Sequence, residues 1–154
     1  MNFEEAFEPS FWIRLGITVF AGLIIGLERQ FRGKAAGIRT CILVCLGAMA
    51  FTRIGVMLQT PTSDPTRVIG QVVTGIGFLG AGMILSRRGQ IQGVTSAAVM
   101  WVLSAIGCVI GTDHHGMAIV LSLVAVGTLM GVEVLETGFQ ALRRGVHANQ
   151  DNKE

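Results

Sequence analysis

The chain has 154 residues, of which 51% are hydrophobic and 14% are charged, and its mean hydropathy is +0.60. A water-soluble domain of this length needs a larger polar surface, so the composition excludes that class. The formal charge of +2 argues against a nucleic-acid-binding protein. The 21 glycines and three prolines argue against collagen and against a disordered chain.

Five apolar segments are long enough to cross a lipid bilayer or nearly so. Short polar stretches separate them, so consecutive helices are expected to be antiparallel neighbours. The sequence therefore predicts an all-α, polytopic membrane helix bundle, with a polar segment at 1–10, a transmembrane domain at 11–138 and a cytoplasmic tail at 139–154. The five predicted spans are 11–27, 38–58, 68–85, 94–111 and 117–135.

Lysines and arginines are distributed unequally between the two ends of the predicted bundle. Those on one side lie in or beside the first loop, in the third loop and in the tail, namely Arg29, Arg32, Lys34, Arg39, Arg87, Arg88, Arg143, Arg144 and Lys153. The other side has only Arg14, Arg53 and Arg67. Because positive residues accumulate in the cytoplasm, this distribution predicts an outer N-terminus and a cytoplasmic C-terminus.

The segment 68–85 contains five glycines, and we expect the rest of the bundle to be arranged around it. Three of these glycines form a G-x-G-x-x-G pattern, but a dinucleotide site needs a preceding strand and an acidic residue about 20 positions later. The stretch 90–111 contains neither Asp nor Glu. Close helix packing or partner contact is therefore the favoured role, because glycine lets two backbones approach in lipid. The residues assigned to it are Gly75, Gly77, Gly80, Gly82 and, opposite a glycine face, Trp101.

A faint internal repeat appears when the chain is shifted by 56 residues. The pattern R-G-x-x-x-G-[IV]-x-[ST] begins at Arg32 and again at Arg88, each time before a predicted helix. It suggests a parallel repeat that relates the first two segments to the third and fourth. Each copy places cationic and hydroxyl groups at a helix N-terminus, which suits anions. Two interpretations stay open: a pair of anion or phosphate-headgroup sites at the cytoplasmic face, or helix caps beside arginines that follow the positive-inside rule.

Charged side chains within a bilayer need a partner or a function. Glu28 either pairs with Arg39 across the first hairpin, or both side chains reach water. Arg53 either extends its charged end to water or pairs with a carboxylate in the bundle. Glu133 is either a buried acid or an interfacial residue. The candidate polar or anion-binding residues are Glu28, Arg29, Arg39, Thr40, Arg88, Ser96 and Glu133.

Nothing in the sequence forms a catalytic constellation, so no enzymatic activity, cofactor or metal is predicted. Cys41, Cys45 and Cys108 lie within apolar runs and are expected to be buried structural thiols. Asp113 and the two histidines after it form either a polar turn or a weak metal site.

At four stretches the sequence resembles the MgtC/SapB family of bacterial inner-membrane proteins. These stretches are GLERQ at 26–30, GKAAGIRT at 33–40, QVVTGIGFLGAG at 71–82 and GVTSAA at 93–98, followed by Trp101. The resemblance implies a multi-pass protein without enzymatic activity, associated with magnesium limitation and virulence. It also implies action on membrane machinery such as the proton-translocating ATP synthase. Many members carry a soluble, ACT-like C-terminal domain, and this chain resembles the short, membrane-only branch.

Two functions from different classes remain. The first is a protein that modulates a membrane partner or ion homeostasis through helix contacts. The expected partner is ATP synthase or a transporter. Homo-oligomers are also expected to be possible, and no nucleic acid is expected to bind. The alternative is a transporter or channel for an ion or small solute, with a polar site between the two helix hairpins.

Overall fold

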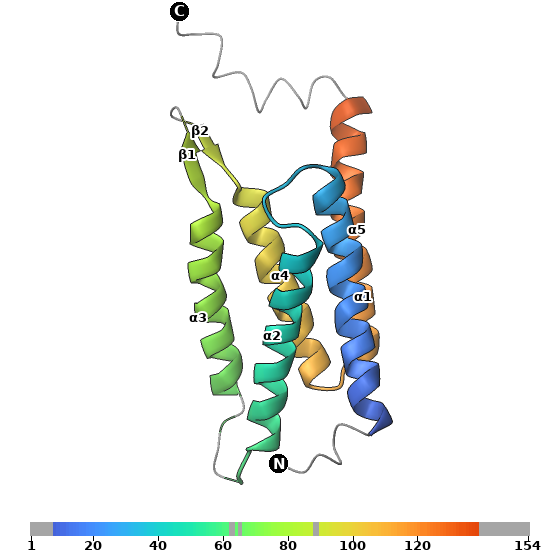
Figure 1. Ribbon diagram of the computed structural model, residues 1–154, viewed down its shortest axis with the longest axis vertical. Helices are drawn as coiled ribbons and strands as arrows, with labels where there is room; N and C mark the ends of the chain where they lie inside the picture. The colour runs from blue at the N-terminus through green and yellow to red at the C-terminus, as the bar shows by residue number, and fades with distance from the viewer. Residues whose placement is uncertain (1–7, 62–63, 65, 88–89, 139–154) are drawn as a thin grey trace, which may run out of the picture.

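The computed structural model describes residues 8–61, 64, 66–87 and 90–138. It is a bundle of long helices with a short β-hairpin at one end (Figure 1). The elements are α1 (Pro9–Phe31), α2 (Ile38–Met57), α3 (Thr66–Met83), β1 (Leu85–Arg87), β2 (Gln90–Gln92), α4 (Val94–Gly111) and α5 (His115–Gly138). The predicted all-α polytopic bundle is confirmed, apart from the two strands.

Four helices are long and apolar enough to cross a membrane: α1, α2, α4 and residues His115–Val132 of α5. Helix α3 has the same length as α4, 18 residues, but is not among them. Its glycines, together with Arg67 and Gln71, lower its hydropathy, although it runs alongside the other helices through the length of the bundle (Figure 1).

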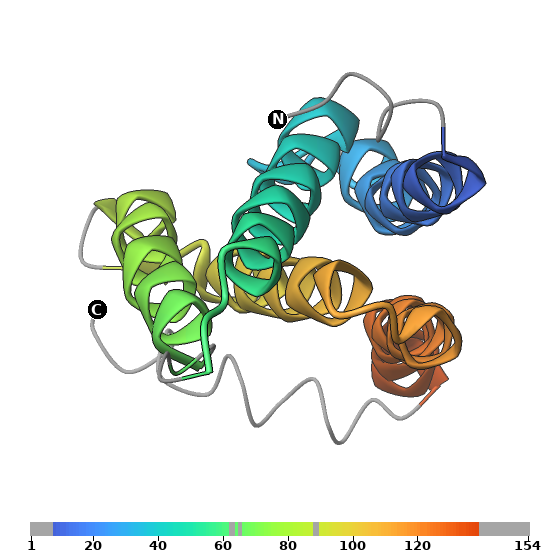
Figure 2. The ribbon, with the colours of Figure 1, turned by 90° about the horizontal axis from the view of Figure 1, so that it is seen from below.

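The centre of the bundle is α4, which lies between α3 and α5 with α2 packed along it (Figure 2). Its side chains Leu103, Ile106 and Ile110 are fully buried. The prediction that segment 68–85 would be the centre is therefore wrong. Only Ile76 and Gly80 are buried in α3, because the glycine-rich helix lies at the side of the bundle and exposes most of its surface.

Glycines allow the backbones of α1, α2 and α4 to approach closely. A Cβ atom added to Gly22 or Gly26 of α1 would lie 2.6 Å from the Cα of Ile42 or Ile38, respectively. On α4, a Cβ at Gly107 would collide with the Cys45 carbonyl oxygen, and one at Gly111 would lie 2.8 Å from the Met49 carbonyl oxygen. These G-x-x-x-G pairs thus fit α2 from both sides, as expected for small-residue packing in lipid.

The arrangement of helices is compatible with the proposed repeat, but the two loops differ. Helix α2 packs mainly on α1 and α4, and α3 packs mainly on α4, so each hairpin keeps its own pair together. The first loop turns at Gly33 (φ +61°), whereas the third forms the antiparallel β1–β2 ladder, with Ser86 opposite Ile91. Gly93 closes that hairpin at φ +91°, where a Cβ would collide with the Met83 carbonyl oxygen.

At the end of the bundle opposite the hairpin, Asp113 joins three elements. It lies in the turn between α4 and α5 and accepts hydrogen bonds from Arg14 of α1 at 2.6 Å and from Arg53 of α2 at 2.9 Å. Burial alone would raise the pKa of Asp113, but the hydrogen bond and charge of Arg14, helped by Arg53 and His115, lower it below its ordinary value. Arg53 therefore pairs with a carboxylate, one of the two alternatives that the sequence left open.

The glycine contacts predict a position-dependent effect of adding one methyl group. Gly107→Ala should destabilise the bundle by about 1–3 kcal/mol because the new Cβ meets the α2 backbone. Gly127→Ala in α5 is the matched control, since its Cβ has open space and alanine favours helix by up to about 1 kcal/mol. Thermal unfolding in detergent, followed by helical circular dichroism, measures both; equal melting temperatures would contradict the packing.

The Asp113 ion pairs predict a loss of stability in acid. The pKa of Asp113 is lower in the folded state than in the unfolded state. The ion pairs therefore contribute fully to stability above the ordinary Asp pKa of about 3.9, and this contribution disappears as the pH falls through the folded-state pKa. Asp113→Asn should cost about 1 kcal/mol at neutral pH, a modest figure because 46% of the side chain is exposed. Melting temperatures from pH 7 to pH 3 should converge for the variant and the wild type.

Asp64→Asn is the comparison variant for that experiment. The hydrogen bonds that Asp64 accepts from the hydroxyl and backbone of Thr66 within its own turn also lower its pKa, so this variant measures the acid dependence of a carboxylate that connects no helices. A parallel decline of the wild type and Asp113→Asn down to pH 3 would show that the pairs do not contribute.

Candidate functional site

The last turn of α1 carries a buried charged cluster. Glu28 and Arg29 are 9% and 2% exposed, although they are adjacent at a helix end where charged residues usually reach water. Arg32 pairs with Glu28 at 2.6 Å (Nε to Oε1), one helical turn further on, and Arg29 lies 3.8 Å from the same carboxylate. The cluster is therefore held by local helix spacing, i to i+4, and not by the hairpin.

Arg29 connects this cluster to the beginning of α4. Its Nη2 donates a hydrogen bond of 2.7 Å to the Oγ of Ser96, and both side chains are buried. The Glu28 carboxylate is shielded from solvent and held by its ion pairs with Arg32 and Arg29, whereas the equally shielded Arg29 Nε has no hydrogen-bond partner. Buried polar atoms in this condition are uncommon, and each calls for an explanation in strain, water or a ligand.

Next to the cluster is a cavity of about 510 Å³, here called the inner polar cavity. Charged, hydroxyl-bearing and apolar side chains all contribute to its lining. It lies where the end of α1, the start of α4 and the second half of α5 meet. Its lining residues are Glu28, Arg29, Arg32, Lys34, Ile91, Gly93, Val94, Thr95, Ser96, Thr128, Leu129 and Val132.

The first turn of α4 borders this cavity without a side-chain cap. Gly93 occupies the N-cap position and offers no hydrogen-bonding side chain. The N–H groups of the first helical residues consequently lack intrahelical partners and, together with the helix dipole, create positive potential there.

The structure brings together only some of the predicted polar residues. Glu28, Arg29 and Ser96 meet at the inner polar cavity. Of the two alternatives for Glu28 and Arg39, the pair is not formed: Glu28 pairs with Arg32 and Arg29, while Arg39 is exposed at the start of α2. Arg39 and Thr40 are not among the residues that line the inner polar cavity.

Two other candidates are not placed. Arg88 lies outside the described residues, and Glu133 belongs to α5 but its side chain is outside the description. Lys34, Thr95 and Thr128 were not among the predicted site residues. For Lys34 and Thr95 a signal was present, because each neighbours a residue of the R-G-x-x-x-G-[IV]-x-[ST] pattern.

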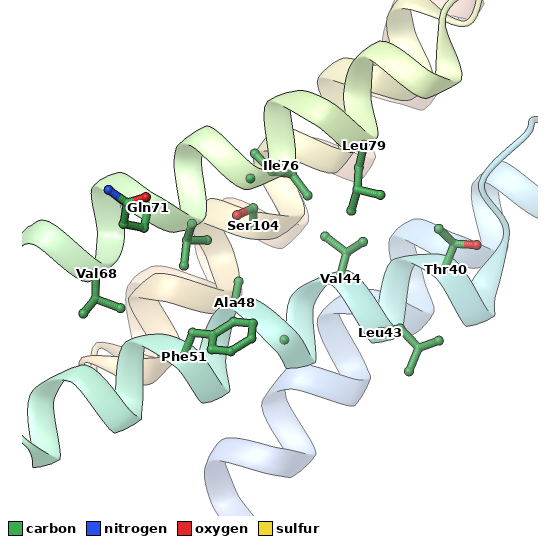
Figure 3. A pocket seen from close by; sticks show the side chains of 13 residues that line it. Thr40, Leu43, Val44, Ala48, Phe51, Val68, Gln71, Ile76, Leu79 and Ser104 are labelled. Carbon is green, nitrogen blue, oxygen red and sulfur yellow. The ribbon is translucent and has the colours of Figure 1, made fainter.

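A second cavity opens between α2 and α3 and is here called the α2/α3 groove (Figure 3). It has a volume of about 590 Å³ and an almost wholly apolar lining. Leu43, Val44 and Phe51 come from α2, while Ile76 and Leu79 come from α3. Its polar lining residues are Thr40, Gln71 and Ser104, the last contributed by α4.

The glycines predicted to pack helices fall into two groups. A Cβ at Gly80 would lie 3.7 Å from Ala97 and 3.9 Å from Trp101, so α4 does face a glycine of α3 there. Gly75, Gly77 and Gly82 would meet nothing within 4 Å. These three do not pack helices within the described part of the chain, and their contact with a partner stays a prediction.

Cys41, Cys45 and Cys108 are buried free thiols, as predicted. Among the described residues, no group of three or more His, Cys, Asp or Glu side chains could hold a metal ion.

Comparison with known proteins places these features in a family. Residues 15–137 match the MgtC family. The chain is 40% identical over 146 residues to the Escherichia coli K12 protein named "Putative magnesium transporter YhiD", covering 90% of this chain and 65% of that protein. It is 44% identical over 128 residues to Protein MgtC of Brucella abortus, covering 80% of this chain and 52% of the relative.

It is also 33% identical over 136 residues to Protein SrpB of Synechococcus elongatus, covering 80% of this chain and 75% of that protein. The chain thus spans about half to two thirds of the length of the first two relatives. No solved structure matches it. The match over residues 15–137 and the four apolar helices of membrane-spanning length lead to one conclusion: this chain is a multi-pass inner-membrane protein of the MgtC family.

Proposed function

We propose that this protein is a non-enzymatic regulator that acts on a membrane-protein partner in magnesium homeostasis or a related stress adaptation. The relatives' names support the magnesium connection, since one is called a magnesium transporter and another MgtC. ATP synthase or a transporter is the kind of partner that the family resemblance suggests. The observation that carries the proposal is the α2/α3 groove with its unused glycines.

Gly47 and Gly75 line this groove on opposite walls, and an added Cβ at either position would meet nothing within 4 Å. Gly77 and Gly82 on α3 are equally open. Elsewhere in the chain, at Gly22 and Gly107, the same residue type is covered by a neighbouring helix. In lipid, helices associate by close backbone packing, so uncovered glycines suit contact with a further transmembrane helix.

Gln71 supports the same proposal. It lies in α3, is exposed and lines the groove. Lipid offers no hydrogen-bond partner to its side-chain amide. A partner helix can satisfy it through an interhelical hydrogen bond, which is worth about 0.6–2 kcal/mol.

Site-specific photo-crosslinking in native membranes tests the groove. A photoreactive residue at Leu79, in the groove, should capture a membrane-embedded protein that one at Leu123, exposed on α5, does not. Gly75→Leu should reduce this capture about tenfold by filling the groove, whereas Gly127→Leu should not. Mass spectrometry identifies the captured chain, and equal capture at both positions, or capture of lipid only, would refute the proposal.

The inner polar cavity favours the alternative, a transporter, because a buried carboxylate lies beside it at one end of the bundle. Proteoliposomes containing only this protein separate the two functions. We expect Mg²⁺ and proton fluxes equal to those of empty liposomes, measured with fluorescent indicators inside the vesicles. Flux above that level that Glu28→Gln abolishes would establish transport and contradict the regulator.

A further inference from the structure

We propose that the inner polar cavity is a binding site for a phosphate group, carried either by a soluble phosphate ester or by a phospholipid headgroup. This inference is independent of the proposed regulatory function, because the inner polar cavity and the α2/α3 groove share no lining residue. It rests on the charges, the helix end, the buried unpaired donor and the mixed polar and apolar lining of the cavity.

Among the described residues, the ionisable side chains that line the cavity are one carboxylate and three cations: Glu28 against Arg29, Arg32 and Lys34. Glu28 lies close to both arginines. Lys34 adds a positive charge outside these ion pairs, so the described part of the lining favours an anion. Arginine and lysine are also the side chains that hold phosphate in proteins.

The beginning of α4 adds donors that do not depend on side-chain charge. Val94, Thr95 and Ser96 form its first turn, and all three line the cavity. Their backbone N–H groups have no acceptor within the helix, and Gly93 leaves them uncapped. A helix N-terminus with free N–H groups is a general binding element for phosphate.

Arg29 is the independent observation that the site is built for a ligand. Its guanidinium is 97% buried, because the side chain is only 3% exposed, yet its Nε has no acceptor. The Ser96 hydroxyl already occupies Nη2. The Arg29 Nε–H group is therefore a buried donor without an acceptor beside a cavity lined by cations. A bound anion would supply the missing acceptor.

The apolar residues in the lining limit the kind of ligand. Ile91, Leu129 and Val132 line the cavity together with the cations. The cavity is also at the end of helices that are long enough to span a membrane. A phosphate attached to a glycerol or similar carbon skeleton suits this mixed lining, because its carbon atoms can contact the apolar side chains.

Binding to the purified full chain in zwitterionic detergent provides the test, in two arms. In the first, calorimetric titration with glycerol 3-phosphate is compared with glycerol. In the second, native mass spectrometry measures retention of phosphatidylglycerol against diacylglycerol, which lacks phosphate. Each arm uses the wild type, Lys34→Gln and the control Arg39→Gln, whose arginine is exposed at the same end of the bundle but outside the cavity.

We expect Lys34→Gln to weaken phosphate binding about tenfold, the effect of losing one charge-assisted contact, while Arg39→Gln matches the wild type. Binding in the first arm identifies a soluble phosphate ester, and retention in the second arm alone identifies a lipid headgroup. Arg29→Lys, which keeps the charge but removes the Nε donor, should also weaken binding. If it does not fold, the Lys34 variant decides.

Failure of both arms in the wild type would overturn the proposal. So would equal losses in Lys34→Gln and Arg39→Gln, because that result would indicate general charge attraction. Neither result bears on crosslinking from the α2/α3 groove, so the two proposals can fail separately.

Discussion

The bundle depends on the absence of side chains where α4 crosses α2. At Gly107 and Gly111 the backbone of α4 lies directly against carbonyl groups of α2, and even a methyl group would collide. Lipid is as apolar as the helix surfaces, so burial from water does not hold these helices together, and close packing must. Once α2 and α4 are joined in this way, α1 and α3 can occupy only the two flanks.

This constraint divides the glycines of the chain by function. The glycines of α1 and α4 that face α2, such as Gly26 and Gly111, pack against that helix within the fold. Those on the outer surface of α3 are free, including Gly77 and Gly82. A helix with so many exposed glycines adds little to the stability of the isolated chain. Its composition becomes understandable if another transmembrane segment covers it.

The charges are also divided, between the two ends of the bundle. At one end Asp113 pairs with arginines from α1 and α2 and connects the helix ends. At the other end, the described residues around the inner polar cavity include three cations and one carboxylate. Helix α4 takes part in both candidate sites, because its first turn borders the cavity and Ser104 lines the groove.

Hydropathy was sufficient to predict the helical membrane bundle, because lipid demands long apolar helices. The quoted sequence motifs were sufficient to indicate the family. Helix periodicity shows which residues share a face but not which helix covers it. Only the tertiary structure could therefore decide that α4, and not the glycine-rich α3, is central. It likewise decided that Glu28 pairs along its own helix with Arg32 and that Arg29 reaches Ser96, 67 positions away.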